Sequence, residues 1–145
     1  MNPKNPTTLE QKLRNIAPAL FESSPVLFAY LYGSYAEGKA HPFSDLDVAI
    51  YVEGLERKAC LETQLSLALK IDEMLDHHAD SEVRALNDLS LTVKGKILLD
   101  GKLIYTRNED KRIQFETQVR LAYFDFLPVI QHYQNIYREK ARLKV

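Results

Sequence analysis

The sequence has few of the features that mark secreted, membrane-spanning or strongly nucleic-acid-binding proteins. Its single cysteine, Cys60, cannot form a disulfide within the chain. No apolar run approaches the length of about 20 residues that a membrane-spanning helix requires. The 19 Lys and Arg residues are balanced by 20 Asp and Glu residues, which gives a formal net charge of −1. A near-neutral chain is not suited to broad electrostatic binding of nucleic acid, so we expect neither a membrane span nor direct nucleic-acid contacts.

The remaining composition is typical of a globular protein of the cytoplasm. The N-terminal residues 1–6 lack the apolar core of a signal peptide. Hydrophobic residues make up 46% of the chain and charged residues 27%, which is ordinary for a soluble domain. A length of 145 residues suggests one domain with a substantial core. We therefore expect a single domain over residues 1–145, located in the cytoplasm.

Apolar segments and their spacing predict alternating strands and helices. Short apolar runs between turn-forming residues predict strands at about 26–31, 46–52, 81–86 and 103–105. Apolar residues at helical spacing, together with capping residues, predict helices at about 8–22, 57–78, 91–98 and 108–143. Pro18 is expected to kink or end the first of these helices.

The central helices carry two further expectations. A short additional helix is predicted directly after Ser34. In the helix over about 57–78, five apolar residues fall on one side: Leu61, Leu65, Ala68, Leu69 and Leu75.

The most informative segment lies between the first two predicted strands. Gly33 and Ser34 are followed by ten residues and then by Asp45 and Asp47, which one residue separates. In an extended segment alternate side chains share a face, so the two aspartates project in the same direction. Two neighbouring carboxylates repel each other unless a cation lies between them. Their hard oxygen atoms suit Mg²⁺, which takes its remaining ligands from water and substrate phosphates.

This pattern resembles the signature of the DNA-polymerase-β-like nucleotidyltransferases, a Gly-Ser pair followed by Asp-x-Asp. The short chain is similar to the minimal nucleotidyltransferase (MNT) subfamily, the antitoxin half of HEPN/MNT toxin–antitoxin pairs. The resemblance covers residues 24–105 as a catalytic core and, more loosely, the helix that follows. It implies an α/β (α+β) fold with a small mixed β-sheet flanked by helices. An ordinary strand-ending turn at Gly33 and Ser34 is the alternative interpretation.

The resemblance also implies a role for each part of the motif. Asp45 and Asp47 are expected to hold Mg²⁺ across the phosphates of ATP. The nucleotide is expected to contact Gly33, Ser34, Lys39 and Ser44. Many relatives carry an arginine where this chain has Glu37, so we expect Glu37 to face outward and Lys39 to supply the positive charge.

A third carboxylate is sought on the strand predicted at 81–86. Asp80, Glu82 and Arg84 share its polar face, and Glu82 is central there. We therefore assign Glu82 as the third catalytic and metal-binding residue, although relatives usually carry Asp. Asp80 is the alternative ligand. A solvent-facing Glu82 paired with Arg84 is the interpretation without a catalytic role.

The predicted C-terminal helix carries apolar residues at steps of three or four over six turns. These residues are Phe115, Val119, Ala122, Phe126, Ile130, Tyr133 and Tyr137. We expect Pro128 to kink the helix, the first half to join the core and the second half to bind a partner, because interfaces favour aromatic residues. Folding of the whole helix onto the core is the alternative.

The resemblance implies the transfer of AMP from ATP to a tyrosine hydroxyl of a HEPN ribonuclease toxin. This modification neutralises the toxin. Two other functions stay open at this point. One is a purely steric antitoxin that covers the toxin with its C-terminal helix. The other is a nucleotidyltransferase that acts on a small molecule such as an aminoglycoside.

Overall fold

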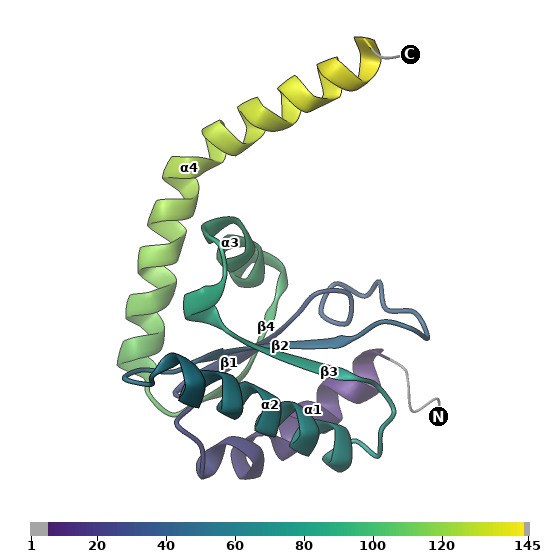
Figure 1. The fold of residues 1–145 in the computed structure, drawn as a ribbon, viewed down its shortest axis with the longest axis vertical. Helices are drawn as coiled ribbons and strands as arrows, with labels where there is room; N and C mark the ends of the chain where they lie inside the picture. The colour runs from purple at the N-terminus through teal and green to yellow at the C-terminus, as the bar shows by residue number, and fades with distance from the viewer. Residues whose placement is uncertain (1–5, 144–145) are drawn as a thin grey trace.

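A four-stranded β-sheet lies between two pairs of helices in the computed structural model, which describes residues 6–143 (Figure 1). The strands are β1 (Phe28–Tyr32), β2 (Leu46–Tyr51), β3 (Ser81–Ala85) and β4 (Lys102–Thr106). The helices are α1 (Pro6–Glu22), α2 (Arg57–Met74), α3 (Leu91–Asp100) and α4 (Glu109–Leu143), with a 3₁₀ turn, η1, at Leu86–Asp88. Residues 1–5 and 144–145 of the predicted domain lie outside the described residues.

The sheet is mixed, with strand order β3-β2-β1-β4. β1 is antiparallel to both β2 and β4, whereas β2 and β3 run parallel. The parallel pair is connected through α2, because parallel strands need a long crossover. This arrangement confirms the predicted fold class.

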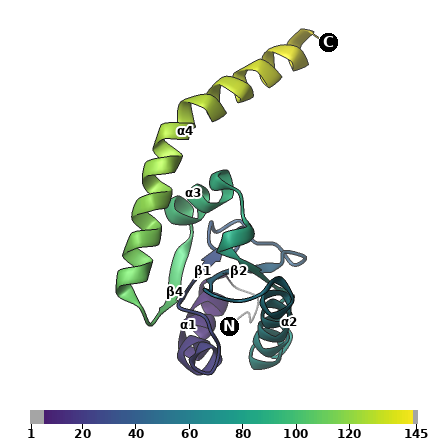
Figure 2. The same cartoon turned by 60° about the vertical axis from the view of Figure 1, so that its left-hand side comes forward.

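Each face of the sheet has its own hydrophobic core. On one face α1 and α2 lie side by side and cover residues such as Leu31, Val48 and Val83 (Figures 1 and 2). On the other face α3 and the first part of α4 cover Phe28 and Tyr30. The two cores hold the middle strands rigidly, so the ends of β1 and β2 are firm supports for a site.

The first half of α4 is fixed to the domain. The Asn108 side chain accepts a hydrogen bond of 3.1 Å from the Lys111 amide and so caps the N-terminus of the helix. The Tyr30 hydroxyl donates a 2.7 Å hydrogen bond to Glu116, which also pairs with Arg112 at 2.9 Å. A Cβ at Gly95 of α3 would overlap the ring of Tyr123, so this glycine permits close packing of the two helices.

The second half of α4 projects away from the rest of the domain (Figure 1). The helix changes direction part-way along, as expected from Pro128, which lacks an N–H donor and lies inside the helix. Val119 and Tyr123 are the buried residues of α4. Tyr123 was not in the predicted stripe, and Ala122, which was, is exposed.

Several local expectations were wrong. The segment after Ser34 forms consecutive turns rather than a short helix. Pro18 does not end α1, which continues to Glu22 in agreement with the helix predicted at 8–22. α2 ends at Met74 instead of near residue 78. Its buried residues are Leu67 and Ile71, whereas three leucines of the predicted apolar side are exposed: Leu61, Leu65 and Leu69.

No helix among residues 6–143 is both long enough and apolar enough to span a membrane.

Candidate active site

A tight turn directly after β1 forms one side of the candidate site. Gly33 has a φ of 73°, a conformation that side chains disfavour. A Cβ at this position would also overlap the carboxylate of Asp47. The turn is closed by hydrogen bonds from the Ala36 and Glu37 amides to the Gly33 carbonyl, both 3.1 Å. Glycine is therefore required here so that the backbone can lie directly against Asp47.

Strand register places Tyr32, Asp47 and Glu82 in one row across three neighbouring strands. Asp47 on β2 is paired with Tyr32 on β1 and with Glu82 on β3. Residues paired across neighbouring strands project to the same face of a sheet. Asp47 and Glu82, which are 35 positions apart in the sequence, are thus adjacent side chains on the face that carries α3.

The other two carboxylates lie one step further along, beyond the strand ends. Asp45 is exposed and immediately precedes β2. Asp80 is also exposed, and its carbonyl accepts a 2.8 Å hydrogen bond from the Leu46 amide. Asp80 therefore lies beside the Asp45 end of β2, while Glu82 lies beside Asp47.

The electrostatics of Asp47 reflect this crowding. Partial burial, followed by the charges of Glu82 and Asp45, raises the pKa of Asp47 to about 6. Burial and the charge of Asp47 also raise the pKa of Tyr32. Three carboxylates in one place disfavour the ionised form of the most buried one, and a bound cation would relieve that repulsion.

These residues fit a magnesium ion in their chemistry. Asp45, Asp47 and Glu82 offer the hard oxygen ligands that Mg²⁺ prefers. Within residues 6–143, no three His, Cys, Asp or Glu side chains are close enough to hold a metal ion as they stand. Asp45 and Glu82 are exposed, and the nearest ion-pair distance between Glu82 and Arg84 is 3.9 Å. The exposed side chains of Asp45 and Glu82 are therefore not held away from Asp47 by packing.

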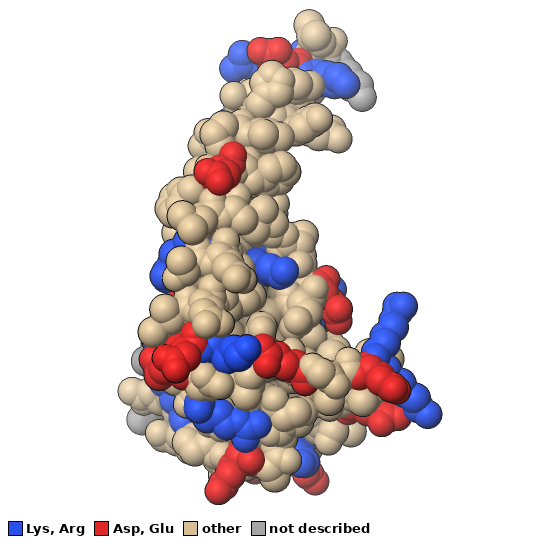
Figure 3. Space-filling model, turned by 90° about the vertical axis from the view of Figure 1, so that its left-hand side faces the viewer, with Lys and Arg blue, Asp and Glu red and all other residues tan. Residues whose placement is uncertain are grey.

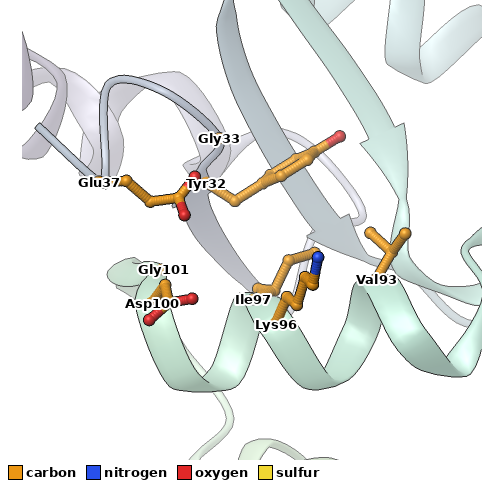
Figure 4. Close-up of a pocket in the computed structure, with 8 residues that line it drawn as sticks. All are labelled: Tyr32, Gly33, Glu37, Val93, Lys96, Ile97, Asp100 and Gly101. Carbon is orange, nitrogen blue, oxygen red and sulfur yellow. The ribbon is translucent and has the colours of Figure 1, made fainter. Parts of the chain in front are cut away.

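A cavity of about 180 Å³ opens beside the Gly33 turn, between β1 and α3 (Figure 4). Its wall on the side of the turn includes Gly33 and Glu37, and Lys96 and Asp100 contribute from α3. The remaining lining residues are Tyr32, Val93, Ile97 and Gly101. The cavity thus lies next to the row that carries Asp47.

The cavity lining alters two expectations about charged residues. We expected Glu37 to face outward, but its side chain lines the cavity (Figure 4). Lys39 is exposed and is not among the lining residues, whereas Lys96 is. Lys96 is therefore the lysine that brings a positive charge to this cavity. Lys96 could not be predicted from the sequence, because its position depends on the packing of α3 against the turn.

Two other predicted nucleotide-binding residues, Ser34 and Ser44, accept hydrogen bonds from backbone amides of the loop between β1 and β2. The Ser34 carbonyl accepts a 2.9 Å hydrogen bond from the Lys39 amide, which closes the turn. The Ser44 hydroxyl accepts a 2.9 Å hydrogen bond from the His41 amide and holds the loop before Asp45. Both residues shape the segment between the two halves of the motif.

Comparison with protein families agrees with this geometry. The model of the family described as polymerase beta, nucleotidyltransferase matches residues 14–110, which span the glycine turn, both aspartates and Glu82. The chain belongs to this nucleotidyltransferase family. A search of curated proteins finds no match at the level of sequence.

Solved structures with the same fold include toxin–antitoxin complexes. A chain of a toxin–antitoxin crystal structure with AMP-PNP is 23% identical, with a TM-score of 0.57, and the match covers 90% of this nucleotidyltransferase and 94% of that chain. A chain from the complex of a tri-AMPylated Shewanella oneidensis HEPN toxin with its MNT antitoxin is 21% identical, with a TM-score of 0.54 and coverage of 92% and 94%. The toxin–antitoxin MntA–HepT gives 20% identity, a TM-score of 0.53 and the same coverage. The fold of this nucleotidyltransferase is therefore the fold of these chains.

The raised pKa of Asp47 predicts that this carboxylate destabilises the metal-free nucleotidyltransferase. The folded state holds the proton more tightly than the unfolded state, so stability falls as the pH rises from about 4 to about 6 and then stays level. Asp47→Asn should raise the free energy of unfolding by about 1 kcal/mol at pH near 7, after discounting for solvent exposure, and by little near pH 4. Thermal unfolding without divalent ions measures this difference.

The matched control is Asp88→Asn, an exposed aspartate of η1 outside the cavity lining. It should leave stability unchanged at both pH values. Mg²⁺ should stabilise the unmodified protein more than the Asp47→Asn variant. Equal stability of Asp47→Asn and the unmodified protein near pH 7 would contradict the described electrostatics.

Proposed function

We propose that this protein is a Mg²⁺-dependent adenylyltransferase antitoxin. It transfers AMP from ATP to a tyrosine hydroxyl of a HEPN-type ribonuclease toxin and thereby neutralises the toxin. The observation that carries the proposal is the row formed by Asp47 and Glu82, with Asp45 at its end, directly against the Gly33 turn. The structure of a tri-AMPylated HEPN toxin with an MNT antitoxin of the same fold supports the choice of substrate.

In this proposal ATP binds with its phosphates between the Gly33 turn and Lys96. The absence of a side chain at Gly33 allows the phosphates to approach the backbone. Lys96 supplies a positive charge opposite the turn, and Ser34, Lys39 and Ser44 complete the predicted contacts. Glu37 and Asp100 would repel an uncompensated triphosphate, which makes Lys96 and the metal ion more important in this chain.

Lys96→Met should therefore weaken ATP binding. Loss of one charged contact to a phosphate predicts a rise of about 10-fold in KM for ATP, with a smaller change in kcat. Steady-state kinetics at varied ATP concentration measures the two constants separately. The matched control is Lys94→Met, because Lys94 lies on the same helix and lines a different cavity with Tyr51 and Phe115. A normal KM for Lys96→Met would remove Lys96 from the site.

The carboxylates carry the proposed chemistry. Asp45, Asp47 and Glu82 would hold Mg²⁺. When bound, Mg²⁺ neutralises charge on the phosphates and assists both attack and departure of the leaving group. The tyrosine oxygen forms a bond to the α-phosphorus of ATP, the bond from that phosphorus to the bridging oxygen breaks, and pyrophosphate leaves. Glu82 accepts the tyrosine proton, which is needed because a tyrosine hydroxyl has a pKa of about 10.

The role of Glu82 is tested against that of Asp80. Glu82→Gln keeps the size of the side chain and removes the charge, so kcat should fall by about 10²–10⁴-fold with near-normal ATP affinity. Asp80→Asn should lower kcat much less, because Asp80 lies beside Asp45 rather than Asp47. Single-turnover rates and nucleotide titrations of both variants give the comparison. The reverse order of effects would make Asp80 the third ligand.

The acceptor is proposed to come from a partner that docks on the projecting part of α4. Exposed aromatic side chains there include Phe126, Tyr133 and Tyr137, the last with 73% of its surface exposed. Figure 3 shows this part of the helix as mostly uncharged surface, with Lys, Arg and Glu side chains gathered at its end. Large exposed aromatic groups are typical of binding surfaces.

The same exposed surface favours one alternative, a steric antitoxin that neutralises the toxin by binding alone. The Asp45→Asn/Asp47→Asn variant separates the two functions in cells that express the toxin. Under the proposal this variant still binds the toxin but fails to rescue growth. Full rescue by the double variant would establish the steric function instead.

A further inference from the structure

The outer face of α2 carries a ridge of three exposed leucines, Leu61, Leu65 and Leu69. Their exposed fractions are 55%, 60% and 68%. Because they are four residues apart, they follow one another along one face of the helix. We call these three residues the leucine ridge.

The leucine ridge is not needed for the core of the domain. α2 packs on the sheet through Leu67 and Ile71, which are 2% and 0% exposed. The ridge is also remote from the candidate active site, since α2 covers the sheet face opposite α3 and α4 (Figure 2). A contiguous exposed apolar strip on a folded protein indicates a binding surface.

The two ends of α2 carry charges of opposite sign. The helix begins with Arg57 and Lys58 and carries Asp72 and Glu73 near its end. Arg57, Lys58 and Glu73 are exposed. Leu65 is the midpoint of this arrangement: Lys58 is seven residues before it, and Asp72 is seven residues after it.

An antiparallel copy of α2 fits this pattern. In a two-fold contact each residue meets the position equally far on the other side of the axis. With the axis at Leu65, this residue meets its own equivalent, and Leu61 meets Leu69 of the second copy. The basic start of each helix then lies beside the acidic end of the other, with Lys58 close to Asp72 and Glu73 of the second copy. A face with leucines symmetric about its centre and opposite charges at its ends is complementary to itself.

We propose that the leucine ridge is the interface of a homodimer, in which two copies of this chain pair through antiparallel α2 helices. A pair of helices forms a small interface, so the dimer is reversible, with a dissociation constant in the micromolar range. Each dimer then carries two candidate active sites and two projecting α4 helices. The proposal does not depend on the adenylyltransferase function.

Sedimentation velocity of the full chain over a range of concentrations tests the dimer. The unmodified protein should shift from monomer to dimer as its concentration rises. Leu65→Lys should remain monomeric, because the axis brings two introduced lysines together. Ser66→Lys, at an exposed position next to Leu65 but off the ridge, is the matched control and should still dimerise. A monomer at every concentration for the unmodified chain would refute the proposal.

A charge exchange tests the antiparallel geometry independently. Lys58→Glu and Glu73→Lys should each raise the dissociation constant about 5- to 10-fold, because each change occurs twice in the dimer. Glu73 is chosen because the Asp72 carboxylate already accepts a 2.8 Å hydrogen bond from the Ser81 amide. The double variant should regain most of the affinity, since its charges are complementary again.

Two results would overturn this geometry. One is a double variant that dimerises more weakly than either single variant. The other is binding of the toxin to the leucine ridge. In that case Leu65→Lys would lose toxin binding, and the unmodified chain alone would stay monomeric. Unchanged circular dichroism and thermal unfolding of each variant show that its fold is intact.

Discussion

Replacement of both motif aspartates, Asp45→Asn with Asp47→Asn, should abolish AMP transfer while the protein stays folded. The two changes remove the negative charge and one of the two carboxylate oxygens of each aspartate, but they keep the size of each side chain. Asp45 is exposed and Asp47 half-buried, so the core is untouched. Because the two residues act as a unit, the loss should exceed that of a general base alone, which is about 10²–10⁴-fold.

Transfer is measured as labelled AMP on the toxin and as pyrophosphate release. The matched control is again Asp88→Asn, which should react at the normal rate. Circular dichroism and toxin binding should be unchanged in the double variant. Transfer at the unmodified rate by a folded double variant would refute the catalytic assignment.

Truncation of the exposed aromatic residues of α4 should separate binding from catalysis. Tyr133→Ala with Tyr137→Ala removes two large side chains that make no contribution to the core, so the protein should fold normally. Truncation of a central aromatic residue of an interface commonly lowers the binding free energy by about 2 kcal/mol or more. We therefore expect toxin binding to weaken by about 100-fold or more, measured by calorimetry or surface plasmon resonance.

The control for this experiment is Asn135→Ala, an exposed residue on the opposite face of the same helix. It should leave toxin affinity unchanged. ATP binding should be normal in all these variants, because the residues that line the cavity come from β1, the Gly33 turn and α3 with its C-terminal Gly101, and not from α4. If the tyrosine variant bound the toxin normally, the partner would dock elsewhere on the domain.

The placement of the carboxylates was predictable because it depends on local geometry. The alternation of side chains in a strand puts Asp45 and Asp47 on one side, and the same rule puts Glu82 on the polar face of β3. Pairing of the second and third strands then brings Asp47 and Glu82 together. The order of apolar runs predicted the individual strands and helices, and the fold class was implied by the resemblance that the motif carries.

The features that were missed depend on tertiary packing. α2 has apolar residues on two faces, and helical periodicity alone cannot tell which face the sheet will cover; Leu67 and Ile71 are buried, and the leucine ridge is not. Lys96 reaches the cavity only because α3 lies across from the Gly33 turn, with Gly95 held against Tyr123. The turn after Ser34 is an exception, because its conformation is set locally by its closing hydrogen bonds.

The intact mass of the toxin tests the proposed function most directly. The measurement requires a HEPN-type toxin that binds this protein, co-expressed once with the unmodified protein and once with the Asp45→Asn/Asp47→Asn variant. The proposal predicts that the toxin gains the mass of one or more AMP groups with the unmodified protein and none with the variant, and that peptide mapping places them on tyrosine. A toxin of unmodified mass that is nevertheless neutralised would contradict the proposal.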